Sequence, residues 1–139
     1  MMSNLTQQNN IGTNDAAGTV DLDALMQANV VRVFNERNST VRLAAICELY
    51  AKDATLYDPE TVATGPEAIS QAVDNLLHSL PPDFVLSAIG HAVGHNGVGR
   101  LFWRAGRPHG SAAVTGTDVA HIENGRIKLL YVFVDPAVR

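Results

Sequence analysis

Two acidic residues stand where a carboxyl group could move protons. Asp58 lies in the segment ATLYDPE (residues 54–60), where a short apolar stretch meets an Asp-Pro step, and Asp118 lies in TGTD, near the end of the chain. A carboxylate placed where a strand leaves an apolar pocket loses hydration, which raises its pKa and makes it a better proton acceptor near neutral pH. Both residues are therefore candidates for proton transfer.

Both residues also have a simpler interpretation. An Asp before Pro is a common turn former whose side chain satisfies nearby backbone groups, and Pro59 prevents a central strand from continuing past Asp58. In the strand alternation, Asp118 shares a face with Ala120 and Ile122, which we take to be the interior. A carboxyl group there needs a partner or a proton, so the sequence leaves open a buried pair with an arginine or a tyrosine.

Other chemistries find little support. His91 and His95 are spaced to share a strand face, but the remaining histidines are scattered and a zinc site needs three or four convergent ligands. Cys47 is the only cysteine, and its place on the apolar face of an expected helix favours buried packing. Glycine-rich phosphate loops and nucleophile motifs are absent. We therefore expect a site without metal or cofactor.

Composition limits the partners. A chain of 139 residues with 46% hydrophobic and 17% charged residues fits one globular domain. A net charge of -4 with only ten Lys and Arg offers no basic stripe to nucleic acid, and the apolar runs are too short to span a bilayer. The N-terminus lacks the pattern of a secretory signal, which favours the cytoplasm. We expect a small apolar ligand, no nucleic acid and no membrane partner.

The elements that must position the two acids follow from hydrophobic spacing. Residues 1–18 are polar and aperiodic, which indicates a flexible arm before a single domain over residues 19–139. The first expected helix, capped by Thr19 or Asp21, ends near Glu36, and the second carries Leu43, Ile46, Cys47 and Tyr50 on one face. The third opens with a capping box in Thr64-Gly65-Pro66-Glu67 and carries Ile69, Val73, Leu76, Leu77 and Leu80.

Extended segments account for most of the rest of the chain. They are expected at residues 54–57, 84–95, 97–105, 112–123 and 126–134, with Asn124-Gly125 as a hairpin turn between the last two. Helices followed by antiparallel strands predict an α+β fold, in which three N-terminal helices pack on one face of a curved, mainly antiparallel sheet. Such a sheet tends to leave a concave interior lined by apolar side chains.

Three segments resemble the nuclear transport factor 2-like superfamily, and within it ketosteroid isomerase and the SnoaL-like polyketide cyclases. They are LYAKDATLYDPE, TGPEAI and TGTDVAHIENGRIKLLYVFVDP, and the resemblance covers about residues 20–136. It implies a cone-shaped roll with an interior cavity. Because the superfamily hosts many activities and also non-catalytic members, the resemblance bears on the fold more strongly than on the function.

The resemblance also implies roles for single residues. Asp58 matches the general base of the isomerase, and Asp118 matches the acid that the isomerase keeps protonated in its oxyanion hole. Phe34 stands in place of the oxyanion tyrosine and has no hydroxyl to donate. Tyr50 matches a supporting tyrosine, whereas Val73 replaces the tyrosine of the third helix. The pocket is therefore expected to differ from that of the isomerase, with Tyr50, Phe34, Trp103 and Val73 as the residues that contact the ligand.

Aromatic residues of the sheet have two interpretations. Trp103 is expected either as a wall of the pocket or as a core or dimer-interface residue. Tyr131 and Phe133 on the last strand are expected to pack between the sheets of two subunits. These residues predict a homodimer formed through the sheet face.

Three functions stay open on this sequence. The first is cofactor-independent proton transfer, of isomerase or cyclase type, on an apolar carbonyl compound, with Asp58 as base, Asp118 as hydrogen-bond donor and Tyr50 as a supporting hydroxyl. The second is a module that binds a hydrophobic ligand without turnover, which Phe34 favours because losing one oxyanion donor typically slows catalysis by about a hundredfold or more. The third is a dimerising accessory domain whose cavity is filled by side chains.

Overall fold

The computed structural model describes residues 21–137, and the flexible arm expected over residues 1–18 lies outside them. Helical segments come first and most strands follow. The helical segments are α1 (Leu22–Asn29), which continues directly as the π-helical turn η2 (Val30–Phe34), α2 (Ser39–Leu49) and α3 (Pro66–Ser79). The strands are β1 (Tyr50–Tyr57), β2 (Val62–Thr64), β3 (Val85–His95), β4 (Val98–Gly106), β5 (Val114–Glu123) and β6 (Arg126–Val134).

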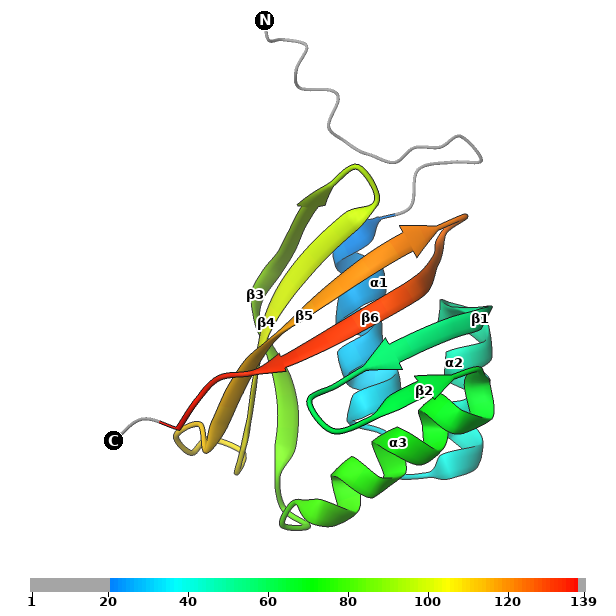
Figure 1. Cartoon of the computed structure of the whole chain (residues 1–139). Helices are drawn as coiled ribbons and strands as arrows, with labels where there is room; N and C mark the ends of the chain where they lie inside the picture. The colour runs from blue at the N-terminus through cyan, green and yellow to red at the C-terminus, as the bar shows by residue number, and fades with distance from the viewer. Residues whose placement is uncertain (1–20, 138–139) are drawn as a thin grey trace, which may run out of the picture.

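The strands form one sheet in the order β2-β1-β6-β5-β4-β3. Only β1 and β6 pair in parallel, and the other neighbours are antiparallel. The helices lie against one face of this sheet, and the strands β4, β5 and β6 present the other face to the viewer in Figure 1. The predicted α+β fold, with three helices on a mainly antiparallel sheet, is confirmed. No helix in the described part of the chain is long and apolar enough to cross a membrane.

Side-chain caps fix the starts of the first two helices. The carboxylate of Asp21 accepts a 3.1 Å hydrogen bond from the backbone N–H of Ala24, and the side chain of Asn38 accepts one of 3.0 Å from Val41. These bonds satisfy amide groups that have no partner within the first turn of a helix. The expected cap at Asp21 and the expected turn at Asn38 are therefore confirmed.

The third helix begins differently from the prediction. Its N-cap is Gly65, with φ at 90°, and no side chain caps it, so the expected capping box between Thr64 and Glu67 does not form. Thr64 belongs instead to β2, where its hydroxyl lies 2.9 Å from that of Thr55 on β1. Glycine reaches this positive φ without strain, and Pro66 supplies a backbone angle that suits the first helical position.

The buried face of α2 is shifted by one residue from the predicted face. Its buried members are Arg42, Ala45, Ile46 and Leu49, and Cys47 is exposed. The expectation of a buried cysteine is therefore wrong. The helix also ends at Leu49, so that Tyr50 starts β1 rather than extending the helical stripe. The prediction placed only apolar residues of α2 in the core, and it therefore missed the face that contains the buried Arg42.

Arg42 is fully buried and joins α2 to α3. Its guanidinium donates to the hydroxyl of Ser70 at 3.0 Å, to the backbone carbonyl of Glu36 at 2.6 Å and to the carboxylate of Asp74 at 2.8 Å. These partners compensate for the loss of hydration of the charge. The bridge fixes α3, which forms one wall of the pocket described below.

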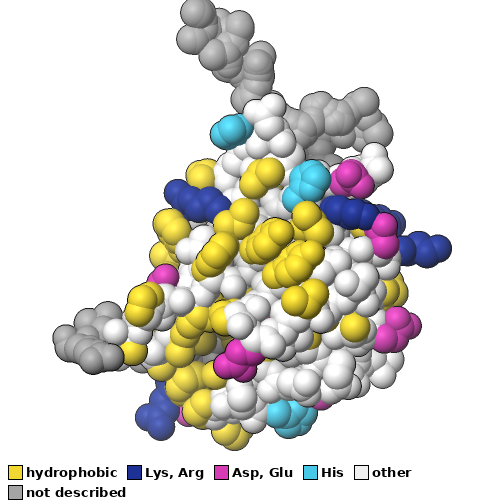
Figure 2. All heavy atoms as spheres, in the orientation of Figure 1, with side chains coloured by type: hydrophobic (Ala, Val, Ile, Leu, Met, Phe, Trp, Pro, Cys, Tyr) yellow, Lys and Arg dark blue, Asp and Glu magenta, His cyan; other side chains and the backbone are white. Residues whose placement is uncertain are grey.

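The core lies between the helices and the inner face of the sheet. On the sheet side it contains Leu56, Leu101, Ala120, Ile127 and Leu130, and on the helix side Met26, Val33, Ile46, Ile69 and Val73. The outer face of the sheet is also partly apolar. Figure 2 shows hydrophobic side chains gathered over the strands that face the viewer, and the exposed members of this face include Ile89, Phe102, Tyr131 and Phe133.

Candidate functional site

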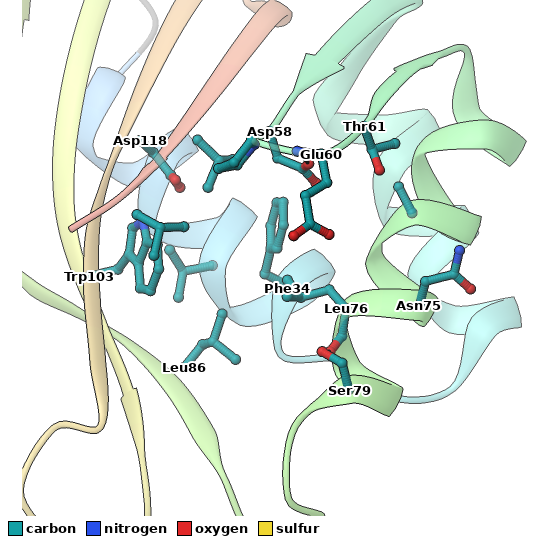
Figure 3. Close-up of a pocket in the computed structure, with 15 residues that line it drawn as sticks. Phe34, Asp58, Glu60, Thr61, Asn75, Leu76, Ser79, Leu86, Trp103 and Asp118 are labelled. Atoms are coloured by element: carbon teal, nitrogen blue, oxygen red, sulfur yellow. Dashed lines mark hydrogen bonds between the residues drawn. The ribbon is translucent and has the colours of Figure 1, made fainter. Parts of the chain in front are cut away.

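A pocket of about 420 Å³ opens between α3, η2, the turn after β1 and the inner face of the sheet (Figure 3). This volume lies within the range of small-molecule sites, roughly 300–1,000 Å³. The lining consists of Val30, Phe34, Asp58, Pro59, Glu60, Thr61, Ala72, Asn75, Leu76, Ser79, Leu86, Trp103, Asp118, Val132 and Val134. The pocket can therefore admit an apolar molecule with a few polar groups.

The pocket has a buried inner end and an exposed rim. Phe34, Leu86, Trp103 and Asp118 form the inner end, and each exposes less than a tenth of its surface. The rim carries Glu60, Thr61, Asn75 and Ser79, all exposed, with Asp58 half-buried beside them. A ligand would meet polar groups first and apolar groups as it goes deeper.

Asp118 is the buried acid of the pocket. It lies on β5 between Leu101 of β4 and Val132 of β6, and its face also carries the fully buried Ala120, as the strand alternation predicted. Burial raises the pKa of Asp118 to about 7, and the neighbouring indole N–H of Trp103 lowers it in part. At neutral pH this carboxyl group is therefore present in both its protonated and its ionised form.

A glycine makes room for the ring of Trp103. It pairs across strands with Gly116, and a Cβ atom at that glycine would overlap the Trp103 ring and the carbonyl oxygen of Phe133. Asp118 follows two residues after Gly116 on the same face, so the indole nitrogen lies toward the carboxyl group (Figure 3). The indole ring can occupy this place only because position 116 is a glycine.

Asp58 closes the turn between β1 and β2. Its backbone N–H donates to the carbonyl of Thr61 at 2.9 Å, and its side-chain Oδ1 accepts a 2.9 Å hydrogen bond from the backbone N–H of Glu60. The prediction that the Asp58 side chain forms a turn is thus confirmed. The carboxylate also lines the pocket, and its second oxygen has no hydrogen-bond partner among the described residues.

The structure brings together four of the six expected site residues. Phe34, Asp58, Trp103 and Asp118 line the pocket. Tyr50 and Val73 were expected to contact the substrate, but both are absent from the lining and almost fully buried. The two are core residues behind the pocket, and that expectation is corrected.

The position of Tyr50 follows from its hydrogen bond. Its hydroxyl donates to the side-chain oxygen of the buried Asn29 at 2.6 Å. Burial raises the pKa of Tyr50 well above its ordinary value, and the nearby carboxylate of Asp118 raises it further. Tyr50 therefore supports the pocket from behind and keeps its proton.

Sequence reasoning missed the wall that α3 provides. Four residues of α3 recur at helical spacing and face the pocket: Ala72, Asn75, Leu76 and Ser79. Val73 follows Ala72 directly and therefore lies on the adjacent side of the helix, which faces the core. This mixed polar and apolar stripe beside the purely apolar one was the signal in the sequence. Glu60 was also missed, although it follows two residues after Asp58.

All charged side chains that line the pocket are acidic. Asp58, Glu60 and Asp118 line the pocket, and the lining contains no Lys, Arg or His. Within residues 21–137, no group of three or more His, Cys, Asp or Glu side chains is placed to hold a metal ion. The arrangement suits a neutral ligand with hydrogen-bonding atoms better than a carboxylate or phosphate.

Fold and site together define an α+β protein with one acid buried in a pocket between the helices and the sheet. The model of the SnoaL-like domain matches residues 28–130, and the chain belongs to this family. No curated protein sequence matches the chain.

Solved structures share the fold. A provisionally named isomerase of the SnoaL-like family from Agrobacterium tumefaciens is 24% identical, with a TM-score of 0.74 over 81% of this chain and 96% of that one. A provisionally named polyketide cyclase from Sinorhizobium meliloti is 20% identical, with a TM-score of 0.63 over 81% and 95% of the two chains. A provisionally named ketosteroid isomerase from Kribbella flavida is 15% identical, with a TM-score of 0.61 over 84% and 79%. Likeness at these identities establishes the fold alone.

Proposed function

We propose that the chain is an enzyme of isomerase or cyclase type that transfers a proton on an apolar carbonyl compound without a cofactor. The observation that carries this proposal is that Asp58 and Asp118, which come from different elements, line one pocket. One carboxyl group is half-buried at the rim and the other is buried at the inner end. Such a difference in environment separates the roles of a base and an acid.

The proposed reaction begins with the free carboxylate oxygen of Asp58. This oxygen takes a proton from the carbon next to the substrate carbonyl, and the electron pair of the broken C–H bond moves to the carbonyl oxygen, giving an enolate. Asp118, while protonated, donates a hydrogen bond to that oxygen. In an isomerisation the substrate is a β,γ-unsaturated ketone, so the anion is a dienolate and Asp58 returns the proton to its γ carbon. In a cyclisation the enolate carbon attacks a second carbonyl of the same molecule, and the oxygen of that carbonyl takes the proton from Asp58.

The surroundings of the two acids support these roles. The hydrogen bond of the turn occupies one oxygen of Asp58 and leaves the other without a partner among the described residues, while burial keeps Asp118 protonated over more of the pH range. The absence of cations in the lining favours a neutral ketone over an acid. The provisional names of the similar structures, isomerase and cyclase, agree with this class of reaction.

Deuterium exchange tests the proposal with 2-tetralone, an apolar bicyclic ketone with acidic hydrogens beside its carbonyl. In deuterated buffer the protein should accelerate exchange of these hydrogens, as measured by NMR. The Asp58→Asn variant should lose this acceleration by about a hundredfold or more, because amide is not a base. Asp53→Asn is the matched control, because Asp53 is an exposed acid on β1, the strand that leads to Asp58, and pairs with Lys128 outside the pocket. Equal rates for the original protein and Asp58→Asn would end the catalytic assignment.

A second candidate is a module that binds a hydrophobic ligand without turnover. The observation favouring it is Phe34, whose ring lines the inner end of the pocket and offers no hydrogen-bond donor. Native mass spectrometry of the purified protein would reveal a retained ligand, and an unchanged ligand after long incubation would favour binding alone. The accessory-domain hypothesis required a cavity filled by side chains, a condition that a pocket of about 420 Å³ does not meet.

A further inference from the structure

The indole N–H of Trp103 is a buried donor that forms no hydrogen bond within the described part of the chain, although it lies close enough to Asp118 to lower the pKa of that carboxyl group in part. Trp103 exposes 8% of its surface, so bulk water does not compensate for the missing partner. Leaving a buried donor unpaired typically costs about 1–3 kcal/mol, and each such group in a folded protein calls for a physical reason. No other buried side-chain nitrogen or oxygen of residues 21–137 is left without a partner.

The fold fixes this unpaired group and does not merely tolerate it. The bare backbone of Gly116 accommodates the ring, and any side chain at that position would collide with it. A side chain at position 116 would therefore displace the ring from its place in the pocket wall. The nitrogen lies on the side of the ring that faces Asp118, at the inner end of the pocket (Figure 3).

Two groups that can donate hydrogen bonds thus line the inner end of the pocket. Asp118 exposes only 5% of its surface, and its carboxyl group can donate when it carries its proton. The indole N–H approaches the same region from the neighbouring strand, β4. Leu86 and Phe34 close the inner end with apolar surface, so a polar atom entering this space would find only these two partners among the side chains at the inner end.

We infer that Trp103 and Asp118 together bind a single oxygen atom of the ligand, with the indole N–H supplying the second donor. The ligand would be an apolar molecule that inserts its carbonyl oxygen first and leaves its hydrocarbon body against α3. This inference rests on the proposed function only in assigning Asp118 as a donor. It adds the residue that positions the carbonyl, and it fixes the orientation of the substrate relative to Asp58.

The orientation has a chemical consequence. An oxygen held by two donors at the inner end places the carbon beside the carbonyl nearer the rim, where the free carboxylate oxygen of Asp58 lies. The developing negative charge of an enolate would be shared between two donors that are already in place. Preorganised donors of this kind stabilise an oxyanion more strongly than those that must reorient.

Because Trp103 is the only tryptophan, the protein gives a single indole resonance in a ¹H–¹⁵N spectrum. Titration of the intact protein with 2-tetralone should move this resonance, whereas tetralin, the same bicyclic skeleton without the carbonyl, should leave it nearly unchanged. Trp103→Phe should weaken 2-tetralone binding by roughly fivefold to tenfold and leave tetralin binding within twofold, since only the hydrogen bond is lost. Calorimetry measures both affinities.

Each outcome has a defined meaning. An indole resonance that stays fixed at saturating 2-tetralone, or no binding of 2-tetralone at millimolar concentration, overturns the inference. Equal loss of affinity for both probes in Trp103→Phe also overturns it, because the ring would then act only as a wall. Loss of deuterium exchange in Asp58→Asn is a separate measurement. If exchange does not depend on Asp58 but the resonance moves, the proposed reaction fails and the oxygen site stands.

Discussion

The backbone N–H of Glu60 donates a 2.9 Å hydrogen bond to Oδ1 of Asp58, so the carboxylate that faces the pocket also closes the turn after β1. A turn residue and a candidate base are therefore the same side chain. The two roles use different oxygens, since Oδ1 accepts from the backbone and the second oxygen has no partner among the described residues. Substitutions can consequently separate the two roles.

Asp58→Asn should preserve the turn, whereas Asp58→Ala should not. Asparagine keeps an oxygen that can accept the Glu60 N–H and occupies turns as readily as aspartate, so its free energy of unfolding should stay within about 0.5 kcal/mol of the original. Alanine removes the acceptor and should cost about 1 kcal/mol. Urea denaturation of the three proteins gives both values. If asparagine proved as damaging as alanine, the negative charge rather than the hydrogen bond would hold the turn.

Burial of Asp118 should make stability fall as pH rises. In the folded chain this group keeps its proton up to about pH 7, whereas in the unfolded chain it ionises near its ordinary pKa of 3.8. Between these values the folded state binds more protons than the unfolded state, so the free energy of unfolding decreases with rising pH. The full difference corresponds to about 4 kcal/mol. The neighbouring groups Tyr50 and Trp103 carry no charge in this window.

Asp118→Asn isolates this effect. The amide resembles the protonated acid and does not titrate, so the stability of the original protein relative to this variant should decline by several kcal/mol between pH 4.5 and pH 8. Urea denaturation at three pH values provides the comparison. Asp53→Asn serves as control, because pairing with Lys128 lowers the pKa of Asp53 and places its titration below this range. A constant difference between the original and Asp118→Asn would contradict the buried acid.

The hydrogen bond between Tyr50 and Asn29 should matter to stability and not to binding. Tyr50→Phe leaves the buried oxygen of Asn29 without a donor and should cost about 1–3 kcal/mol. The double variant Tyr50→Phe with Asn29→Leu replaces both polar groups and should recover part of that loss. Affinity for 2-tetralone should change less than twofold in Tyr50→Phe, because Tyr50 is absent from the lining. A large loss of affinity would return Tyr50 to the site.

The fold was predictable where local signals and the global pattern agree. Asn124-Gly125 marks the hairpin between β5 and β6, both of which were located within about two residues. The Asp-Pro step likewise ended β1 near Tyr57. These signals depend only on backbone chemistry, so they act in the same way in any fold.

The errors arose where a tertiary contact overrides a local rule. Arg42 is buried because Ser70 and Asp74 of α3 receive its guanidinium, and no spacing within α2 reveals that partnership. The same holds at Thr64, whose place in β2 is decided by pairing with Thr55. Two residues of the site, Asp58 and Asp118, were predicted from sequence motifs. The residues of α3 that line the pocket could not be predicted in this way, because their identification depends on which side of that helix meets the sheet.

The outer face of the sheet carries a row of side chains that are mostly large and apolar, and we propose that two copies of the chain pair through it. Register places Ile89, Phe102, Thr117 and Phe133 side by side across four strands. Three of these are apolar and expose between 43% and 54% of their surface. An exposed apolar row of this length is typical of an interaction surface, and Figure 2 shows that the surrounding side chains on this face include further hydrophobic ones.

Phe102→Glu should therefore give a monomer. Two glutamates would face each other near the middle of a symmetric interface, where burying charge is unfavourable, and the apolar contact area of the ring, which Arg100 also contacts, would be lost as well. Analytical ultracentrifugation should show twice the mass of one chain for the original protein and one chain for the variant. Val31→Glu is the matched control, since Val31 is 62% exposed but lies on η2, away from the sheet face. If the dimer persisted in Phe102→Glu and dissociated in Val31→Glu, the interface would lie on the helices and not on the sheet. A new charge disrupts the dimer only when it is introduced into the face that forms the contact.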